Sequence, residues 1–163
     1  MSDFPEIYVI RHGQTEWNVA RRHQGQLDSD LTALGRGQAA QMGEVLGRQA
    51  LDLSSMQFFT SPLGRAYQTA KIALANFPVE LHIDERLAEI AFGLWSGKTQ
   101  DEINREWPEL SRLAEDDPIV WNFQSPGGES LTELERRCDA FLADLTGPAV
   151  LFTHGVLSRV LRA

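Results

Sequence analysis

The 163-residue sequence contains one cysteine, Cys138, so it can form neither an internal disulfide nor a zinc site built on several cysteines. It also lacks any apolar run approaching the roughly 20 residues that a membrane-spanning helix needs. Basic residues are in the minority, with 15 Lys and Arg against 23 Asp and Glu and a formal net charge of -8. Nucleic acid and anionic membranes are therefore disfavoured as partners, whereas a small anion can still bind in a locally positive pocket.

The remaining composition is typical of one globular domain. Hydrophobic residues make up 42% of the chain and charged residues 23%, as in ordinary soluble proteins. A chain of this length can bury a core without disulfides. The first six residues have neither the basic nor the apolar region of a signal peptide. We therefore expect a cytoplasmic protein in which residues 1–163 form a single domain.

Two short apolar runs near opposite ends of the chain have the same sequence context. Residues 7–10 are followed by Arg-His-Gly and residues 149–152 by Thr-His-Gly. Both runs are typical of buried strands, and ligands of open α/β sheets bind beyond the carboxyl ends of such strands. Either His12 or His154 alone would be read as an ordinary strand-end residue. Together, and with Arg11 beside the first, they indicate chemistry on an anion.

Strand and helix patterns alternate along the rest of the chain. Further strands are predicted over residues 57–60 and 79–83. Helices are predicted with apolar faces formed by Ala39, Met42 and Leu46; by Ala66, Ala70, Ala73 and Phe77; and by Leu131, Leu134, Cys138, Phe141, Leu142 and Leu145. The alternation predicts an α/β fold, a three-layer sandwich with a mostly parallel central sheet flanked by helices.

Local signals place the ends of several helices. Thr32 is expected to cap the helix that follows it, and Gly147-Pro148 to end the last long helix. Capping-box patterns are formed by Thr99 with Glu102 and by Ser130 with Glu133. Cys138 lies on an apolar helix face, so we interpret it as a small core residue and not as a nucleophile.

Phosphate chemistry suits the residues around the first histidine. A guanidinium such as that of Arg11 can bind a phosphate through two parallel hydrogen bonds, and a neutral imidazole can attack phosphorus. Arg65 follows the second predicted strand and could bring a second guanidinium, although an isolated arginine there is more often a solvated residue at a helix start. Four histidines could suggest zinc. A guanidinium beside His12 would repel that cation, so we expect no metal.

An ordered series of motifs covers almost the whole chain. It comprises Arg11-His12-Gly13 with Thr15 and Asn18, Gln24-Gly25 through Leu31-Thr32 with Gly35, Thr60 to Leu63 with Arg65, Ala66, Gln68 and Thr69, Leu87, Glu89, Phe92-Gly93, Trp95 to Gly97, Gly127 to Ser130, and Thr153-His154-Gly155. In this order the motifs resemble the histidine phosphatase superfamily, which includes the cofactor-dependent phosphoglycerate mutases. The resemblance implies a phosphoglycerate mutase-like fold.

The resemblance also implies catalytic roles. His12 would be the nucleophile that becomes phosphohistidine, and Glu89 the general acid that protonates the leaving oxygen. Chemistry alone does not choose Glu89 over Asp84 or Glu85. The implied phosphate-binding set is Arg11, Asn18, Arg65, His154, Thr15, Gln24 and Gly25, with Arg11, Arg65 and His154 also catalytic. His154 is expected to act as a charged donor to the phosphate. No cofactor is implied.

Two departures from the family pattern affect the functional prediction. The sequence ends shortly after Gly155, so either it is truncated or the protein lacks the edge strand usual in the family. An uncovered sheet edge leaves a homodimer open. Only about thirty residues separate Gly97 from Gly127, where mutases carry a longer insertion that encloses the substrate. A shorter cover would leave a phosphohistidine open to water.

We therefore predict hydrolysis of a small phosphomonoester. Mutase-type phosphoryl transfer and a non-catalytic module that binds phosphorylated ligands are the alternatives, and the sequence does not identify the substrate. Trp121, Asn122 and Phe123 are candidates for the substrate mouth, although packing would explain the two aromatic residues equally well. His23 and His82 are assigned no chemistry.

Overall fold

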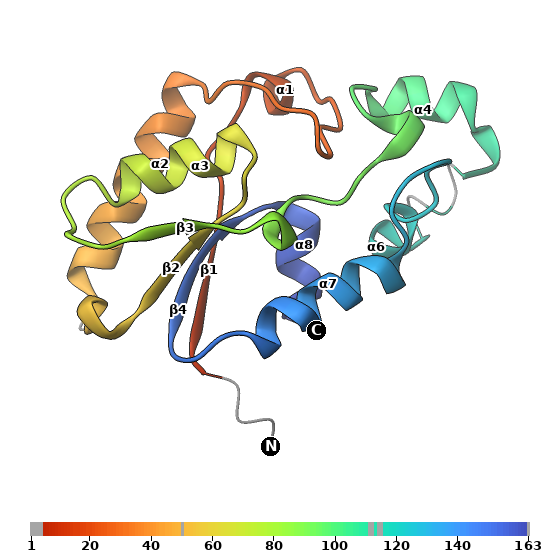
Figure 1. The fold of residues 1–163 in the computed structure, drawn as a ribbon. Helices are drawn as coiled ribbons and strands as arrows, with labels where there is room; N and C mark the ends of the chain where they lie inside the picture. The colour runs from red at the N-terminus through yellow and green to blue at the C-terminus, as the bar shows by residue number, and fades with distance from the viewer. Residues whose placement is uncertain (1–4, 50, 111–112, 114–115, 163) are drawn as a thin grey trace.

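The computed structural model describes residues 5–49, 51–110, 113 and 116–162. The fold is built on a four-stranded parallel sheet (Figure 1). The strands are β1 (Ile7–Arg11), β2 (Gln57–Thr60), β3 (Leu81–Ile83) and β4 (Ala149–Thr153). They lie in the order β1-β4-β2-β3, and each neighbouring pair is parallel. The predicted parallel sheet is therefore confirmed, with the last strand of the sequence near its centre.

Helices cover both faces of the sheet. The helices with described bounds are α1 (Glu16–Val19), α2 (Ala33–Arg48), α3 (Gly64–Ala73), α4 (Gln100–Glu106), α6 (Pro118–Trp121), α7 (Leu131–Ala143) and α8 (Gly155–Val160). Figure 1 shows α2 and α3 on one side of the sheet and α7 and α8 on the other. This arrangement confirms the three-layer α/β sandwich. No helix among the described residues is long and apolar enough to cross a membrane.

Strand β4 is the centre of the core. All five of its residues are buried. Ala149 and Leu151 pack into the cluster beneath α7 and α8, while Val150 and Phe152 pack into the cluster beneath α2 and α3. A strand buried on both faces needs an almost continuous apolar run, which explains the composition of this segment.

The parallel register brings the two His-Gly junctions together. Arg11 pairs with Thr153 at the ends of β1 and β4, so His12 and His154 leave the sheet side by side. The backbone N–H of His12 donates to the carbonyl of Thr153 at 3.0 Å. Residues about 140 positions apart in sequence thus reach one edge of the sheet, where ligands of such sheets bind.

Three predicted element boundaries are wrong by two or more residues. Strand β3 begins at Leu81 and not at residue 79, because the N–H of Val79 closes a tight turn with the carbonyl of Phe77. Helix α3 ends at Ala73, so Phe77 lies beyond it, although its ring still packs against the core. Helix α7 likewise ends at Ala143, before the predicted Gly-Pro stop.

The buried face of α2 differs from the predicted one. Ala39 and Leu46 are buried as expected, but Met42 is 41% exposed. Gly43 makes the close contact with α3, at the backbone of Ala73, and Gly35 packs against the backbone of Gln14 in the loop after β1. Because Gly43 has no side chain, α2 and α3 approach closely at this point. Glycine therefore lies in the helix contact, and the apolar Met42 beside it stays exposed.

Capping signals correctly located the starts of three helices, α2, α4 and α7. The capping boxes at the start of α4 and α7 both form, and the Thr32 hydroxyl accepts from the N–H of Gly35. Cys138 is buried in the core beside Phe141. Burial raises the pKa of its thiol to about 11, which supports its interpretation as an unreactive core residue.

Two glycines of α2 provide a matched test of this packing. A Cβ added at Gly43 would collide with the Ala73 carbonyl, whereas one at Gly37 would meet nothing within 4 Å. Gly43→Ala is expected to lower the free energy of unfolding by about 1–3 kcal/mol through overpacking. Gly37→Ala should raise it by about 0.5–1 kcal/mol, because alanine is the better helix former. Urea denaturation measures both, and shifts of the same sign would contradict the proposed close contact.

Candidate active site

A cavity of about 210 Å³ opens at the carboxyl ends of the strands. Seven of the predicted site residues line it: Arg11, His12, Asn18, Gln24, Gly25, Arg65 and Glu89. Seven further residues also line it: Arg22, His23, Phe92, Asn122, Gly155, Val156 and Arg159. Two of the predicted residues, Thr15 and His154, lie outside its wall. The structure therefore gathers most of the expected set around one opening.

The imidazole of His12 is held in one tautomer. Its Nδ1 lies 2.7 Å from the carbonyl oxygen of Gly13. Because that oxygen can only accept, Nδ1 carries the proton and Nε2 keeps a free lone pair. The pKa of His12 is lowered to about 4, mainly by burial, with the positive charges of Arg65 and Arg11 acting in the same direction. The ring is therefore neutral at pH 7, as a nucleophile requires.

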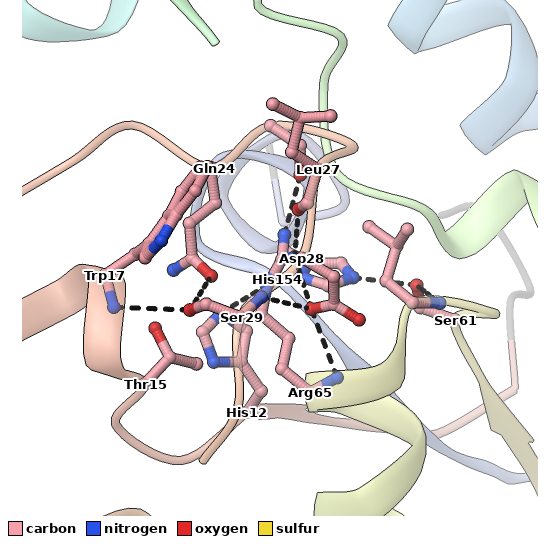
Figure 2. Close-up of polar contacts among 12 residues, drawn as sticks. His12, Thr15, Trp17, Gln24, Leu27, Asp28, Ser29, Ser61, Arg65 and His154 are labelled. Atoms are coloured by element: carbon pink, nitrogen blue, oxygen red, sulfur yellow. Dashed lines mark hydrogen bonds and ion pairs between the residues drawn. The ribbon is translucent and has the colours of Figure 1, made fainter. Parts of the chain in front are cut away.

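Arg65 lies directly against Nε2 of His12 (Figure 2). Its Nε donates to Nε2 of His12 at 3.3 Å. The rest of the guanidinium is anchored by carbonyl oxygens of Leu27 and Gly25, both at 2.7 Å, and by an ion pair with Asp28 at 3.0 Å. Burial lowers the pKa of Arg65, and Asp28 opposes this shift. The guanidinium is thus a fixed cation and not a solvated helix-start residue.

Glycine is required in the loop that holds Arg65. Gly25 adopts a left-handed backbone with φ of +54°, and its carbonyl is one of the two that accept from Arg65. The neighbouring Gln24 is positioned through Ser29, whose hydroxyl donates to the Gln24 Oε1 at 3.0 Å and accepts from the N–H of Trp17 at 3.2 Å. These contacts hold the loop against the cavity.

Thr15 has a different place from the predicted one. It is fully buried and caps α1, where its hydroxyl accepts from the N–H of Asn18. In return the Asn18 Oδ1 accepts from both the N–H and the hydroxyl of Thr15, at 3.0 and 3.1 Å. The structure thus places Thr15 behind Asn18 and not on the cavity wall. These bonds leave the Asn18 amide nitrogen without a protein partner among the described residues.

His154 is buried behind His12. The two ring centroids lie 5.2 Å apart, and the His154 Nε2 lies 2.7 Å from the hydroxyl of Ser61. Its Nδ1 is buried and has no hydrogen-bond partner in the described part of the chain. Burial, followed by the charges of Arg65, His12 and Arg11, lowers the pKa of His154 well below its usual value. The expectation of a charged donor therefore does not hold for the ligand-free protein.

Glu89 is fixed at the beginning of α8. Its two carboxylate oxygens accept from the backbone N–H groups of Ile90, Val156 and Leu157, each at 3.1 Å. The side chain is 8% exposed and lines the cavity. Neither Asp84 nor Glu85, the alternatives left open by chemistry alone, lines it. Glu89 is thus the one of these three carboxyl groups that borders the cavity with His12.

The expected mouth residues separate into two groups. Asn122 lines the cavity, whereas Trp121 stacks on Trp95 in the core, with ring centroids 4.4 Å apart. Phe123 packs against the same core. His23, to which no chemistry was assigned, also lines the cavity, with its ring 5.3 Å from that of Trp121. The two aromatic residues therefore pack in the core and do not line the cavity.

Residues missed from the sequence carry much of the geometry. Asp28 lies in a segment interpretable only as a turn, so its ion pair with Arg65 had no local signal. Ser61 was part of a recognised motif, but its contact with His154 depends on the neighbouring strand ends.

No group of three or more His, Cys, Asp or Glu side chains arranged to hold a metal occurs within the described ranges. A neutral nucleophile, fixed cations and one carboxyl group suit transfer of an anionic group.

Comparison with known proteins gives a consistent family. The family model of the histidine phosphatase superfamily (branch 1) matches residues 7–163. Phosphoserine phosphatase 1 of Hydrogenobacter thermophilus is 35% identical over 140 residues, which are 86% of this chain and 64% of that enzyme. The protein named probable phosphoglycerate mutase GpmB of Salmonella paratyphi C is 36% identical over 160 residues, covering 93% of this chain and 70% of that protein.

Solved structures agree with the sequence comparison. A mycobacterial glucosyl-3-phosphoglycerate phosphatase in complex with VO3 superposes with a TM-score of 0.77 at 35% identity, covering 95% of this chain and 78% of the other. The matched part of this chain thus spans 64% of the length of the phosphoserine phosphatase, which is less than two thirds. It spans 70% of the length of the GpmB protein and 78% of the mycobacterial phosphatase.

Titration of His12 tests the electrostatics of the cavity. By ¹⁵N NMR, the His12 ring should be neutral with the proton on Nδ1 at pH 7, and should protonate near pH 4 and not near 6.5. Arg65→Gln should move this pKa upward, because it removes a nearby positive charge. The spectrum of a His12→Asn variant identifies the signal. Protonation near pH 6.5 in the wild type, or a proton on Nε2, would contradict the described site.

Proposed function

This chain belongs to the histidine phosphatase superfamily (branch 1), and on that premise we propose that it hydrolyses small phosphomonoesters through a phosphohistidine at His12. The observation that carries the proposal is the state of the His12 ring. Its Nδ1 donates to the Gly13 carbonyl, its pKa is lowered to about 4, and its Nε2 borders Arg65. The free lone pair on Nε2 of His12 therefore lies beside the fixed guanidinium of Arg65 at the cavity, where an anionic phosphate would bind.

The first step transfers the phosphoryl group to the protein. The His12 Nε2 forms a bond to phosphorus while the bond from phosphorus to the ester oxygen breaks. Arg11 and Arg65 stabilise the negative charge on the equatorial oxygens. For this the bond between the Arg65 Nε and the His12 Nε2 must give way to a phosphate oxygen. The amide of Asn18 and the unpartnered nitrogen of His154 supply further donors.

Glu89 serves the leaving group and then the water. In its protonated form it gives its proton to the departing oxygen, so that an alcohol and not an alkoxide leaves. The resulting carboxylate accepts a proton from water as the water oxygen attacks the phosphohistidine. Inorganic phosphate leaves and Nε2 regains its lone pair. The three N–H donors to Glu89 hold it in one position for both steps.

Hydrolysis is favoured over the two alternatives. Two of the three compared relatives are named as phosphatases, while the third carries a mutase name and supports phosphoryl transfer as the second candidate. A silent binding module would not need both a nucleophile and an acid at one cavity. The acidic composition supports a small metabolite and not nucleic acid as the partner. A cytoplasmic location and a homodimer are parts of the same proposal.

Phosphate release from a panel of phosphomonoesters is the direct test. The wild type should release phosphate equally with and without a chelator, because arginines supply the positive charge in this mechanism. His12→Ala should lower the rate by at least about 10³-fold. His82→Ala, at a half-exposed histidine outside the cavity, is the matched control and should retain activity. Turnover that survives in His12→Ala, or that a chelator abolishes, would refute the proposal.

The role of Glu89 can be tested through the leaving group. Glu89→Gln keeps the shape but removes the acid, so kcat/KM for an alkyl phosphate should fall by about 10²–10⁴-fold. The loss for p-nitrophenyl phosphate should be much smaller, because nitrophenolate leaves without protonation. The parameter kcat/KM reports the first transfer and not the later hydrolysis. Glu85→Gln is the control. Equal losses on both substrates would show that Glu89 is not the leaving-group acid.

A further inference from the structure

The proposed reaction gives no role to the motif from Gly127 to Ser130, and Glu129 within it does not line the cavity. Glu129 forms an ion pair of 2.7 Å with Arg137 of α7, and both side chains are mostly buried, at 13% and 18% exposed. Such a pair is weak evidence for stability, because the loss of hydration offsets the attraction between the charges. The further contacts of the two side chains therefore indicate their role.

The pair binds the backbone on both sides of Glu89. The Nε and Nη2 of Arg137 donate to the two carboxylate oxygens of Glu129, at 2.7 and 3.0 Å. The remaining nitrogen of the guanidinium, Nη1, donates to the backbone carbonyl of Arg86 at 2.6 Å. The Glu129 carboxylate also accepts from the N–H of Ala91 at 3.3 Å, and the N–H of Glu129 donates to the carbonyl of Ala91 at 2.8 Å.

Glu89 lies in a stretch without regular structure. Residues 88–92, between the 3₁₀ turns Glu85–Leu87 and Gly93–Trp95, belong to no helix or strand. The backbone groups of this stretch therefore find their hydrogen bonds in other segments, and those bonds set its position. Gln26 donates to the carbonyl of Glu89 itself at 3.2 Å. The Arg137–Glu129 pair supplies the bonds at residues 86 and 91.

Gly128 allows the close approach of Glu129 to Ala91. A Cβ at residue 128 would lie 2.9 Å from the carbonyl oxygen of Ala91, too close for a real side chain. Ser130 then caps α7, and Arg137 follows about two helical turns later. The motif and the helix thus direct two opposite charges to the segment that carries Glu89.

We propose that Arg137 and Glu129 are positioning residues that hold Glu89 where it protonates the leaving oxygen. Neither residue lines the cavity, so their effect passes through the backbone of residues 86–91. The inference rests on the proposed function, because Glu89 acts as an acid only in that reaction. Displacing a catalytic group by about 1 Å can lower a rate by about 10²-fold. Loss of the pair should therefore slow the step that needs the acid.

Arg137→Gln tests this inference through the leaving group. In this variant kcat/KM for an alkyl phosphate should fall by about 10-fold or more. The value for p-nitrophenyl phosphate should change much less, because nitrophenolate leaves without an acid. The ratio of the two values does not depend on the fraction of folded protein, so it separates positioning from stability. Arg137→Lys keeps the charge but not the fork. It should lower the same ratio and replaces Arg137→Gln if that variant does not fold.

Two control variants change α7 or its end without removing the bonds at residues 86 and 91. Asp144→Asn removes the exposed ion pair of Asp144 with the side chain of Arg86. Leu142→Ala removes apolar packing from α7 and lowers stability. Both should keep the wild-type ratio. An unchanged ratio in the Arg137 variants, or an equal fall in either control, would overturn the inference.

A double variant distinguishes failure of this inference from failure of the proposed function. In Glu89→Gln no acid remains to be positioned, so adding Arg137→Gln should lower kcat/KM for the alkyl phosphate by less than about 2-fold. If the wild type hydrolyses neither substrate, or if Glu89→Gln loses equally on both, the acid role fails and this inference fails with it. If Glu89→Gln discriminates between the substrates but Arg137→Gln adds its full loss in the double variant, only the inference fails.

Discussion

The pairing of β1 with β4 is the constraint on which the site depends. These strands come from opposite ends of the chain, and their parallel register sets Arg11 against Thr153. The residue directly after each strand is a histidine. The backbone hydrogen bond from His12 to Thr153 therefore holds both histidines at the carboxyl-end edge of the sheet. Burial of β4 on both faces holds this register, because a shift would move apolar side chains out of two separate clusters. The catalytic geometry is thus a consequence of core packing.

The same arginines that would bind phosphate add to the effect of burial in keeping the His12 ring neutral. Burial lowers the pKa of His12 and His154, and the charges of Arg65 and Arg11 act in the same direction. Asp28 and two carbonyl oxygens keep Arg65 in place at that distance. A bound phosphate dianion would offset these positive charges and raise the proton affinity of the buried imidazoles. In the proposed mechanism, phosphate binding would therefore favour protonation of His154, so a neutral ring in the ligand-free protein is compatible with a donor in the occupied site.

The sequence predicted the parts of this site that have local signals. Apolar runs followed by His-Gly located the strand ends, capping patterns located helix starts, and the ordered motifs selected Glu89 among nearby acids. Contacts between distant segments had no such signal. The ion pair of Asp28 with Arg65 and the bond of Ser61 to His154 exist only once the sheet has formed. The apolar periodicity also predicted wrongly that Met42 is buried. The contact with α3 is made by Gly43, which an apolar pattern does not detect because glycine has no side chain.

Helix α8 links the edge of the sheet to the acid of the proposed reaction. It begins directly after His154, and the N–H groups of Val156 and Leu157 donate to the Glu89 carboxylate. The chain that leaves β4 therefore holds both the second histidine and the carboxyl group relative to His12, whose backbone is bonded to the same strand end. Groups held in this way need little reorganisation when a substrate binds, and such restraint lowers the entropic part of the barrier.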